Sequence, residues 1–241
     1  MLELKPERFN LIAEASSHPI SVCGKPLIAD SSGALYWPAQ STLMIADLHL
    51  EKGSFHAERG RMLPPYDTRQ TLIRLAEAIE RYAPARVVAL GDSLHDTGAA
   101  ARIGADDLER LALLQEGREW IWITGNHDPE IAEVLGGQVC AELRIAGLTL
   151  RHEPTHGHVS HEIAGHMHPA ARISMYGTSI RRPCYVANGR RLVMPAFGAF
   201  AGGLNVLDGA FEPLFGNGGL FVWMLGNEGL YPVATRLLCG D

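Results

Sequence analysis

Three short apolar runs, separated by segments with helical spacing, constrain the fold of this chain more than any other feature. The runs cover residues 42–46, 86–90 and 120–123, and each has the length of one buried strand. After the first run, apolar residues recur at helical spacing from Leu72 to Ile79, and a second helical segment covers residues 107–115. Strands that alternate with helices predict a sheet with helical cover.

Extended segments flank this alternating region on both sides. Before it, residues 20–22, 27–29 and 35–37 are separated by turn signals and predict a leading hairpin. Beyond about Val139 the helical period fades, and the extended runs are residues 148–150, 184–187, 191–194 and two strands within 220–233. Asn188-Gly189 is a strong signal for a hairpin turn. No repeat or linker divides the chain, so we expect one domain over residues 1–241.

Composition predicts a folded chain without a membrane segment. Apolar residues form 46% and charged residues 20% of the chain, near the average for globular proteins. The first nine residues carry four charges where a secretion signal needs an apolar stretch. No apolar run reaches the ~20 residues that span a bilayer. We therefore expect a cytoplasmic protein with no membrane partner.

Charge and cysteine usage exclude two further classes. A formal charge of −6 argues against a broad nonspecific nucleic-acid surface, because such binding depends on Lys and Arg neutralising phosphates. Any affinity for phosphate must therefore be local. The cysteines are far apart, which favours reduced, buried thiols over a zinc knuckle or a disulfide framework. They are Cys23, Cys140, Cys184 and Cys239.

Polar side chains follow each of the three apolar runs. They are Asp47 and His49 after the first, Asp92 after the second, and Asn126, His127 and Asp128 after the third. Residues i and i+2 of an extended chain point the same way, so Asp47 and His49 could bind one cation. Loops that carry ligands lie outside the carboxyl ends of strands in such sheets. The three clusters should therefore meet in space.

Histidines crowd the region after the third cluster. His152 ends the run at 148–150, and His166 with His168 forms another i, i+2 pair after a short extended segment. Gly165 and that segment favour a functional role for this pair. The remaining histidines of the region are expected to be solvated instead. They are His156, His158 and His161.

The ordered motifs resemble those of the calcineurin-like metallophosphoesterase superfamily. They are Asp47-x-His49, Gly91-Asp92, Gly125-Asn126-His127-Asp128, His152 and Gly165-His166-x-His168, and they cover about residues 43 to 169. A narrower resemblance is to the ligase-associated DNA damage response endonuclease branch. It rests on residues 47–54, 63–68, 152–154, 181–184 and 195–198.

The resemblance implies an α/β fold, a metal site and a chemistry. The fold is a four-layer metallophosphoesterase sandwich, in which two mixed β-sheets are flanked by helices. Asp47, His49, Asp92 and His168 would hold one divalent ion, and Asp92, Asn126, His152 and His166 a second. The ions would be Mn²⁺ by resemblance, and mixed oxygen and imidazole donors also suit iron or zinc. His127 would contact the phosphoryl group and protonate the leaving oxygen.

The predicted function is hydrolysis of phosphodiester bonds by a dinuclear metal site. By resemblance the enzyme is a DNA endonuclease in ligase-associated repair, with DNA, a DNA ligase and a helicase as partners. A small-molecule phosphatase or a nucleotide pyrophosphatase could use the same site. A catalytically silent binding scaffold is the alternative from another class, and the complete ligand set argues against it.

Several residues near the motifs keep two interpretations. His95 could contact substrate, or cap a helix on the surface. Asp128 precedes Pro129 and fits the start of a helix, so we expect it to be structural or a partner of His127. Arginines could bind a nucleic-acid backbone, because a guanidinium binds phosphate through two donors, or they could be solvated. These are Arg59, Arg61, Arg181 and Arg182.

Overall fold

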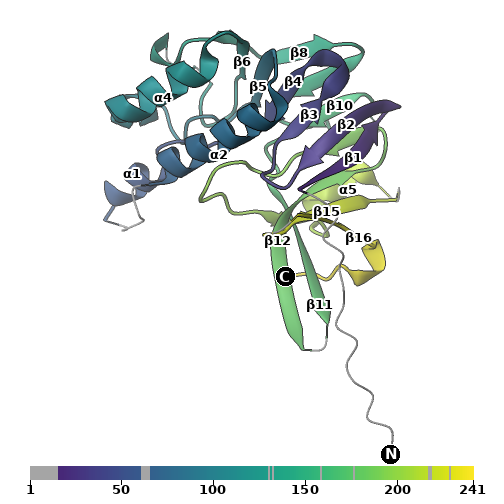
Figure 1. Ribbon diagram of the computed structural model, residues 1–241. Coiled ribbons are helices and arrows are strands. Elements are labelled where there is room, and N and C mark those ends of the chain that lie inside the picture. The colour runs from purple at the N-terminus through teal and green to yellow at the C-terminus, as the bar shows by residue number, and fades with distance from the viewer. Residues whose placement is uncertain are drawn as a thin grey trace, which may run out of the picture.

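The structure is a computed structural model in which two β-sheets pack face to face (Figure 1). It describes residues 16–60, 66–129, 131, 133–157, 159–175, 177–216, 219–227 and 229–241. Some residues discussed above lie outside the described residues. These are the N-terminal segment, Arg61, residues 63–65 of one motif, His158 and Glu228.

The first sheet is antiparallel in its first half and parallel in its second. Its strands, in order across the sheet, are β1 (Ser17–Val22), β2 (Lys25–Asp30), β3 (Leu35–Trp37), β4 (Thr42–Ile45), β5 (Arg86–Leu90), β6 (Glu119–Ile123) and β7 (Gln138–Cys140). Antiparallel pairing runs from β1 to β4, and parallel pairing from β4 to β7. The predicted leading hairpin and the three apolar runs are therefore confirmed as strands.

Helices α2 (Asp67–Tyr82) and α4 (Ala105–Gln115) cover the outer face of this sheet. The short helices α1 (Lys52–Ala57) and α3 (Ala99–Arg102) contact each other, and the 3-10 turns are η1 (Pro38–Gln40) and η2 (Glu133–Leu135). Leu72, Leu75 and Ile79 of α2 are buried against the strands, as their helical spacing predicts. Figure 1 shows α2 running along the sheet with α4 beside it.

The second sheet is mixed and carries a long hairpin. Its strands are β8 (Glu142–Ile145), β9 (Leu148–Arg151), β10 (Glu162–Ala164), β11 (Pro169–Met175), β12 (Thr178–Ala187), β13 (Arg191–Val193), β14 (Leu204–Asn205), β15 (Phe221–Leu225) and β16 (Leu230–Val233). The neighbours β9, β10 and β13 are parallel. Asn188-Gly189 joins β12 to β13 in the predicted hairpin, where Val186 pairs with Val193. The β11–β12 hairpin extends beyond the body of the molecule in Figure 1.

Two apolar cores separate the layers, and a third lies under a small outer cover. Side chains of both sheets form the central core, which includes Trp37 and Tyr185. The outer face of the second sheet packs against η3 (Gly209–Phe211) and α5 (Glu212–Phe215), and η4 (Thr235–Leu237) follows β16. The four-layer α/β fold is confirmed, with a fourth layer that is only a few residues long.

The cysteines match the expectations from composition only in part, and the helices match them. All four cysteines are free, but only Cys184 is fully buried, so the expectation of buried thiols holds for one of them. No described helix is long and apolar enough to cross a membrane.

Candidate metal centre

Parallel strands from both sheets deliver the predicted ligands to one place. Asp47, Asp92 and Asn126 follow β4, β5 and β6, which are parallel neighbours of the first sheet. His152 and His166 follow β9 and β10, which are parallel neighbours of the second. Because parallel strands end at one edge of a sheet, two facing edges bring these side chains together.

One group of ligand atoms comprises Asp47, His49 and His168. Their side-chain donor atoms all lie within 4.8 Å of one another. Nε2 of His49 is 3.1 Å from Nε2 of His168, and Nε2 of His168 is 3.3 Å from Oδ1 of Asp47. Asp47 and His49 are buried, and Asp47 also accepts hydrogen bonds from the backbone N–H of His166.

A second group comprises Asp92, His152 and His166, and Asn126 adjoins it. Nε2 of His152 lies 3.4 Å from Oδ1 of Asp92, 3.1 Å from Nδ1 of His166 and 2.9 Å from Oδ1 of Asn126. The other carboxylate oxygen of Asp92 lies 3.9 Å from Nε2 of His49 in the first group. Asp92 thus reaches both groups, which is the geometry required of a carboxylate shared by two ions.

The ring of His152 provides the test of whether a cation fits here. Nδ1 of His152 donates to the carbonyl oxygen of Leu90 at 2.9 Å, which leaves the lone pair of a neutral ring on Nε2. That nitrogen then faces the acceptor oxygens of Asp92 and Asn126. Acceptors that face one another need a proton or a metal ion between them. The donor set therefore fits divalent cations.

The pKa values of the predicted ligands also indicate that this site favours a positive charge. Burial lowers the pKa of His152, but its hydrogen bond to Asp92 and the charges of Asp47 and Asp92 raise it to about 9. Burial, with His168, lowers the pKa of His49 to about 3, and burial with His152 lowers that of His166. Burial opposes ionisation of Asp92, yet His152 holds its pKa well below the usual range. In the ion-free protein a proton on His152 stands in for a cation.

The backbone of the ligand segments is left-handed rather than extended. The residues with positive φ are Asp47 (53°), His49 (44°), Asp92 (47°), His166 (68°) and His168 (43°). Each such residue costs of order 1–3 kcal/mol, and such strain clusters at functional sites. The interpretation of both i, i+2 pairs as extended chain is therefore wrong. Their side chains converge because alternate residues turn, and backbone hydrogen bonds such as His49 N–H to Asp92 O at 2.9 Å hold the turns.

Two glycines allow the strand ends to approach this closely. Gly91 has φ 78°, and a Cβ there would lie 2.4 Å from Cγ of His152. A Cβ on Gly125 would lie 2.2 Å from Oδ1 of Asp92 and 2.3 Å from its backbone nitrogen. A side chain at either position would clash with the centre, which explains why the motifs have glycine there.

His127 is exposed beside the two groups and is held at two points. Its backbone N–H donates to Oδ1 of Asp92 at 2.9 Å, and its Nδ1 donates to the carbonyl oxygen of His95 at 2.8 Å. The ring stands edge-on to His49, with centroids 5.1 Å apart. Nε2 remains without a hydrogen-bond partner in the described part of the chain, so it can face a substrate.

Asp128 is structural, as expected, but it joins two loops of the centre, and no described helix begins there. Its carboxylate accepts from the backbone N–H groups of Ser93 at 2.7 Å, Leu94 at 3.0 Å and Gly125 at 3.0 Å. Burial raises the pKa of Asp128 to about 6, and these donors oppose the rise. Asp128 therefore ties the loop after β5 to the loop after β6.

The remaining candidates separate into the surface and the vicinity of the centre. His156 and His161 are exposed, as expected of solvated residues. Arg181 of the hairpin forms an ion pair with Asp241 at 2.9 Å, which occupies its guanidinium. His95 and His127 stack at 5.4 Å, and their ring nitrogens with those of His49 form a third group within 4.8 Å. The rings of Phe55 and His56 in α1 contact the ring of His95, and neither residue belongs to a motif recognised in the sequence.

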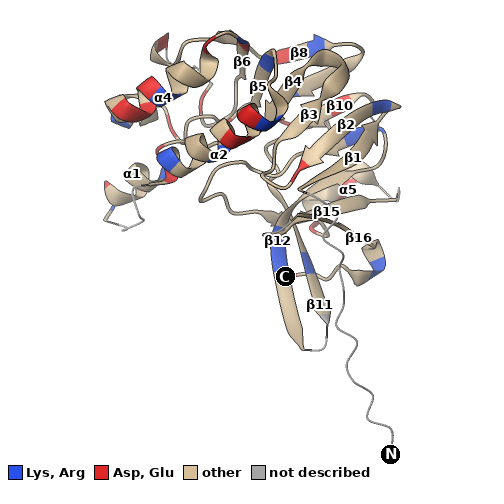
Figure 2. Cartoon of the chain, in the orientation of Figure 1, with Lys and Arg blue, Asp and Glu red and all other residues tan. Residues whose placement is uncertain are grey.

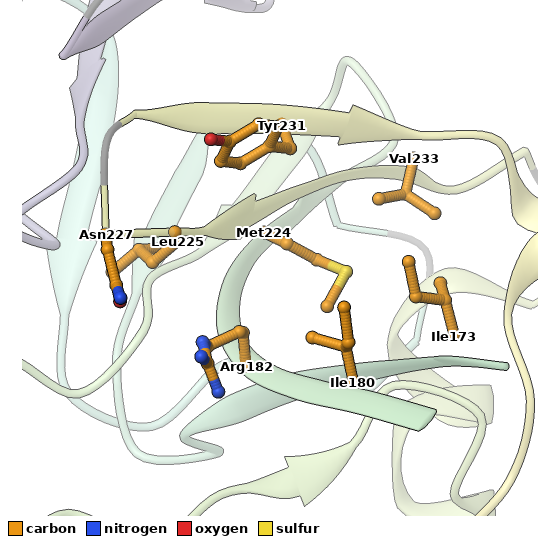
Figure 3. Close-up of a pocket in the computed structure, with 9 residues that line it drawn as sticks. Ile173, Ile180, Arg182, Met224, Leu225, Asn227, Tyr231 and Val233 are labelled. Atoms are coloured by element: carbon orange, nitrogen blue, oxygen red, sulfur yellow. The ribbon is translucent and has the colours of Figure 1, made fainter. Parts of the chain in front are cut away.

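Arg182 lies at a cavity that contains none of the predicted ligands. This cavity of about 350 Å³ is formed by β11, β12, β15 and β16. Figure 3 shows Met224 pointing toward Ile180, with Arg182 beside them. The charged residues of β11 and β12 are basic, and these strands carry only the blue colour of Lys and Arg in Figure 2. Arg182 thus belongs to the hairpin and not to the metal centre.

Comparisons with known proteins agree with this geometry. The sequence model for calcineurin-like phosphoesterases matches residues 41–158, which include the predicted ligands from Asp47 to His152. The chain resembles the calcineurin-like phosphoesterases in sequence and in fold. The resemblance predicted from the motifs is thereby confirmed. No curated protein sequence matches the chain.

One solved structure matches most of the chain. The crystal structure of the nuclease MPE from Pseudomonas putida has a TM-score of 0.69 and 27% identity, and the match covers 90% of this chain and 100% of that one. Yfce, a phosphoesterase from E. coli, has a TM-score of 0.37 and 15% identity over 83% and 96% of the chains, too distant to support an argument. The family match and the nuclease support a hydrolase of the phosphodiesterase or nuclease kind.

Proposed function

We propose that this chain is a dinuclear-metal phosphodiesterase that cleaves DNA as an endonuclease in a ligase-associated repair system of the cytoplasm. The observation that carries the proposal is the pair of ligand groups that share Asp92. The likeness to a nuclease structure supports a nucleic acid as the substrate, and DNA is our proposal. A DNA ligase and a helicase of the same system are the proposed protein partners.

The residues of the two groups would each hold one ion. Asp47, His49, Asp92 and His168 form the first site, and Asp92, Asn126, His152 and His166 form the second. Mixed oxygen and nitrogen donors suit Mn²⁺, iron or zinc, and we favour Mn²⁺. When bound, two such ions supply an activated water and polarise the phosphoryl oxygens.

His127 is the proposed general acid. The carbonyl of His95 fixes the ring through Nδ1, so Nε2 of the protonated ring can donate to the departing oxygen. The backbone N–H of His127 also holds one oxygen of Asp92 in place. His127 therefore couples proton delivery to the position of the shared carboxylate.

The surroundings of the centre favour a long substrate over a nucleotide or a small phosphomonoester. A hollow of about 470 Å³ beside the second group is lined by Asn126, Arg151 and His152. Another of about 420 Å³ is lined by His166, His168 and Leu204. Because the centre has room on two sides, a strand can enter and leave.

Metal content and substrate range together test the proposal. Protein saturated with Mn²⁺ and desalted should hold close to two ions per chain, and Asp92→Asn should lose most of them. With Mn²⁺ the protein should cleave bis(p-nitrophenyl) phosphate and single-stranded DNA, and a chelator should abolish both activities. Turnover confined to monoesters or nucleotides would overturn the nuclease assignment, and a metal content near zero would overturn the dinuclear site.

A further inference from the structure

One face of α1 lies against the metal centre and carries two kinds of side chain that bind nucleotides. Lys52, Phe55 and His56 follow the spacing i, i+3 and i+4 on one side of α1. Arg59 lies in the turn after the helix, and its guanidinium returns over the ring of Phe55. We call these four residues the α1 face. Nothing in the proposed hydrolysis requires them.

Phe55 connects the α1 face to the histidines of the centre. Its ring lies 4.6 Å from the ring of His95 at an interplanar angle of 82°, and His95 stacks on His127. His56 packs edge-on to Phe55 at 5.5 Å. A continuous row of rings therefore leads from His127 to the surface of α1.

The guanidinium of Arg59 packs over the ring of Phe55 on the solvent side of this row. It lies 3.5 Å from the centroid of the Phe55 ring, and Nη1 donates to the carbonyl oxygen of Phe55 at 3.1 Å. Arg59 is exposed and forms no ion pair among the described residues. A guanidinium fixed over a ring presents a flat cationic surface on which a nucleobase can stack.

Lys52 adds a positive charge to the α1 face. It lies three residues after His49, at the start of α1, and its side chain is half-buried. The carboxylate that acts on it is Asp67, which already accepts the backbone N–H of Gly53 at 2.9 Å. Lys52 forms no hydrogen bond or ion pair within the described ranges.

Arg102, a neighbouring cation, differs from Lys52 and Arg59 because it forms ion pairs. Arg102 lies at the same helix, where Nε donates to Ser54 Oγ at 3.0 Å, but its guanidinium pairs with Asp96 and lies 3.9 Å from Glu58. Its charge is thus neutralised by the protein. In a chain of net charge −6, half-buried Lys52 and exposed Arg59 without such partners are available to an anion.

We propose that the α1 face is a subsite for the nucleotide next to the scissile phosphate, with its base stacked on the Arg59 guanidinium, which Phe55 supports, and its phosphate bound by Lys52. This inference rests on the proposed function and specifies its substrate as a strand with flanking phosphates and bases. Single-stranded DNA is favoured, because a paired base cannot reach a stacking surface without leaving its duplex.

Three substrates separate the two contacts. Oligothymidylate offers flanking phosphates and bases, the dinucleotide TpT offers bases but no flanking phosphate, and an abasic oligonucleotide of equal length offers flanking phosphates without bases. The full chain loaded with Mn²⁺ is assayed for kcat/KM on each.

Lys52→Gln tests the phosphate contact. We expect its loss of kcat/KM on oligothymidylate to exceed its loss on TpT about tenfold, and the slope of log KM against log salt to fall by about 0.7, the value for one phosphate of a single strand. Lys25→Gln, on β2 of the first sheet, is the matched control and should match wild type. Equal losses on both substrates, or an unchanged slope, would overturn the phosphate contact.

Phe55→Leu tests the stack, because it keeps apolar volume and removes the ring that holds the Arg59 guanidinium. We expect a roughly tenfold loss on oligothymidylate, in the range of one lost base stack, and a much smaller loss on the abasic strand. Phe221→Leu, at an exposed position of β15, is the control. The same loss on both strands contradicts the stack. If wild type hydrolyses bis(p-nitrophenyl) phosphate but no DNA, the proposed function itself fails, and wild type alone shows it.

Discussion

His127 contacts Asp92 through its backbone and His95 through its ring. Its N–H holds Asp92 and its Nδ1 is bound to the carbonyl of His95, whereas neither ring nitrogen belongs to the two groups around Asp92. The side chain can therefore be removed while the backbone contact to Asp92 remains. This separation allows acid catalysis to be measured apart from metal binding.

We expect His127→Ala to keep its ions and lose rate by roughly 10²–10⁴-fold on DNA, the usual contribution of a general acid. The loss should shrink on bis(p-nitrophenyl) phosphate, because nitrophenolate leaves without protonation. Metal content and kcat on both substrates test this, with His166→Ala as the variant that should lose metal. An emptied metal site in His127→Ala, or full activity on DNA, would show that His127 is not the acid.

At the scale of elements, the loops after β5 and β6 are tied together by a single carboxylate. Asp128 accepts three backbone N–H groups from these loops, and both loops carry predicted ligands. The glycines at Gly91 and Gly125 let the same loops pass close to His152 and Asp92. The geometry of the centre thus depends on residues that touch no ion.

Asp128→Ala should destabilise the protein by about 3 kcal/mol, because buried N–H groups lose their acceptor. It should also weaken Mn²⁺ binding, since Asn126 lies on a loop that is then less constrained. Urea unfolding and metal titration measure the two effects. Asp106→Ala, whose side chain is 85% exposed, is the control and should change neither. Unchanged metal affinity in a destabilised Asp128→Ala would limit Asp128 to folding alone.

At the scale of the whole molecule, the metal centre joins the two sheets. Asp47 and Asp92 follow strands of the first sheet, whereas His152 and His166 follow strands of the second. An ion bound by both sides favours the folded state over the unfolded chain, which lacks the assembled site. Stability should therefore depend on metal, and through His152 on pH.

The sign of the pH effect follows from the raised pKa of His152. In the ion-free protein its protonation stabilises the fold below pH 6.5, and this contribution is lost as pH rises through about 9. Metal must displace that proton, so apparent Mn²⁺ affinity should rise toward pH 9 by up to about tenfold per unit. We expect the Tm gained from Mn²⁺ to grow between pH 7 and 9, and Asp92→Asn to gain little. A gain that falls with pH would contradict this account.

The sequence alone predicted those strands and helices that have a local pattern of apolar residues. The strands at 42–45, 86–90 and 119–123 and the helix α2 could be predicted because apolar spacing reports which face is buried. The strands β7, β8, β11 and β14 could not. Residues of β7 are largely exposed, and β14 has two residues, so neither shows an alternating pattern.

The identity of the candidate ligands was also readable from the chain, because each follows a strand and retains a distinctive residue type. Tertiary structure decided how they meet: His49 and His168 are 119 residues apart and lie 3.1 Å from each other. It also imposed left-handed turns on Asp47 and His49 where the sequence predicted an extended chain. The sequence did not indicate a role for the α1 face, which followed only from the contact between Phe55 and His95 in the structure. A sequence encodes local preference, whereas strain and contacts between distant segments are set only when the two sheets pack.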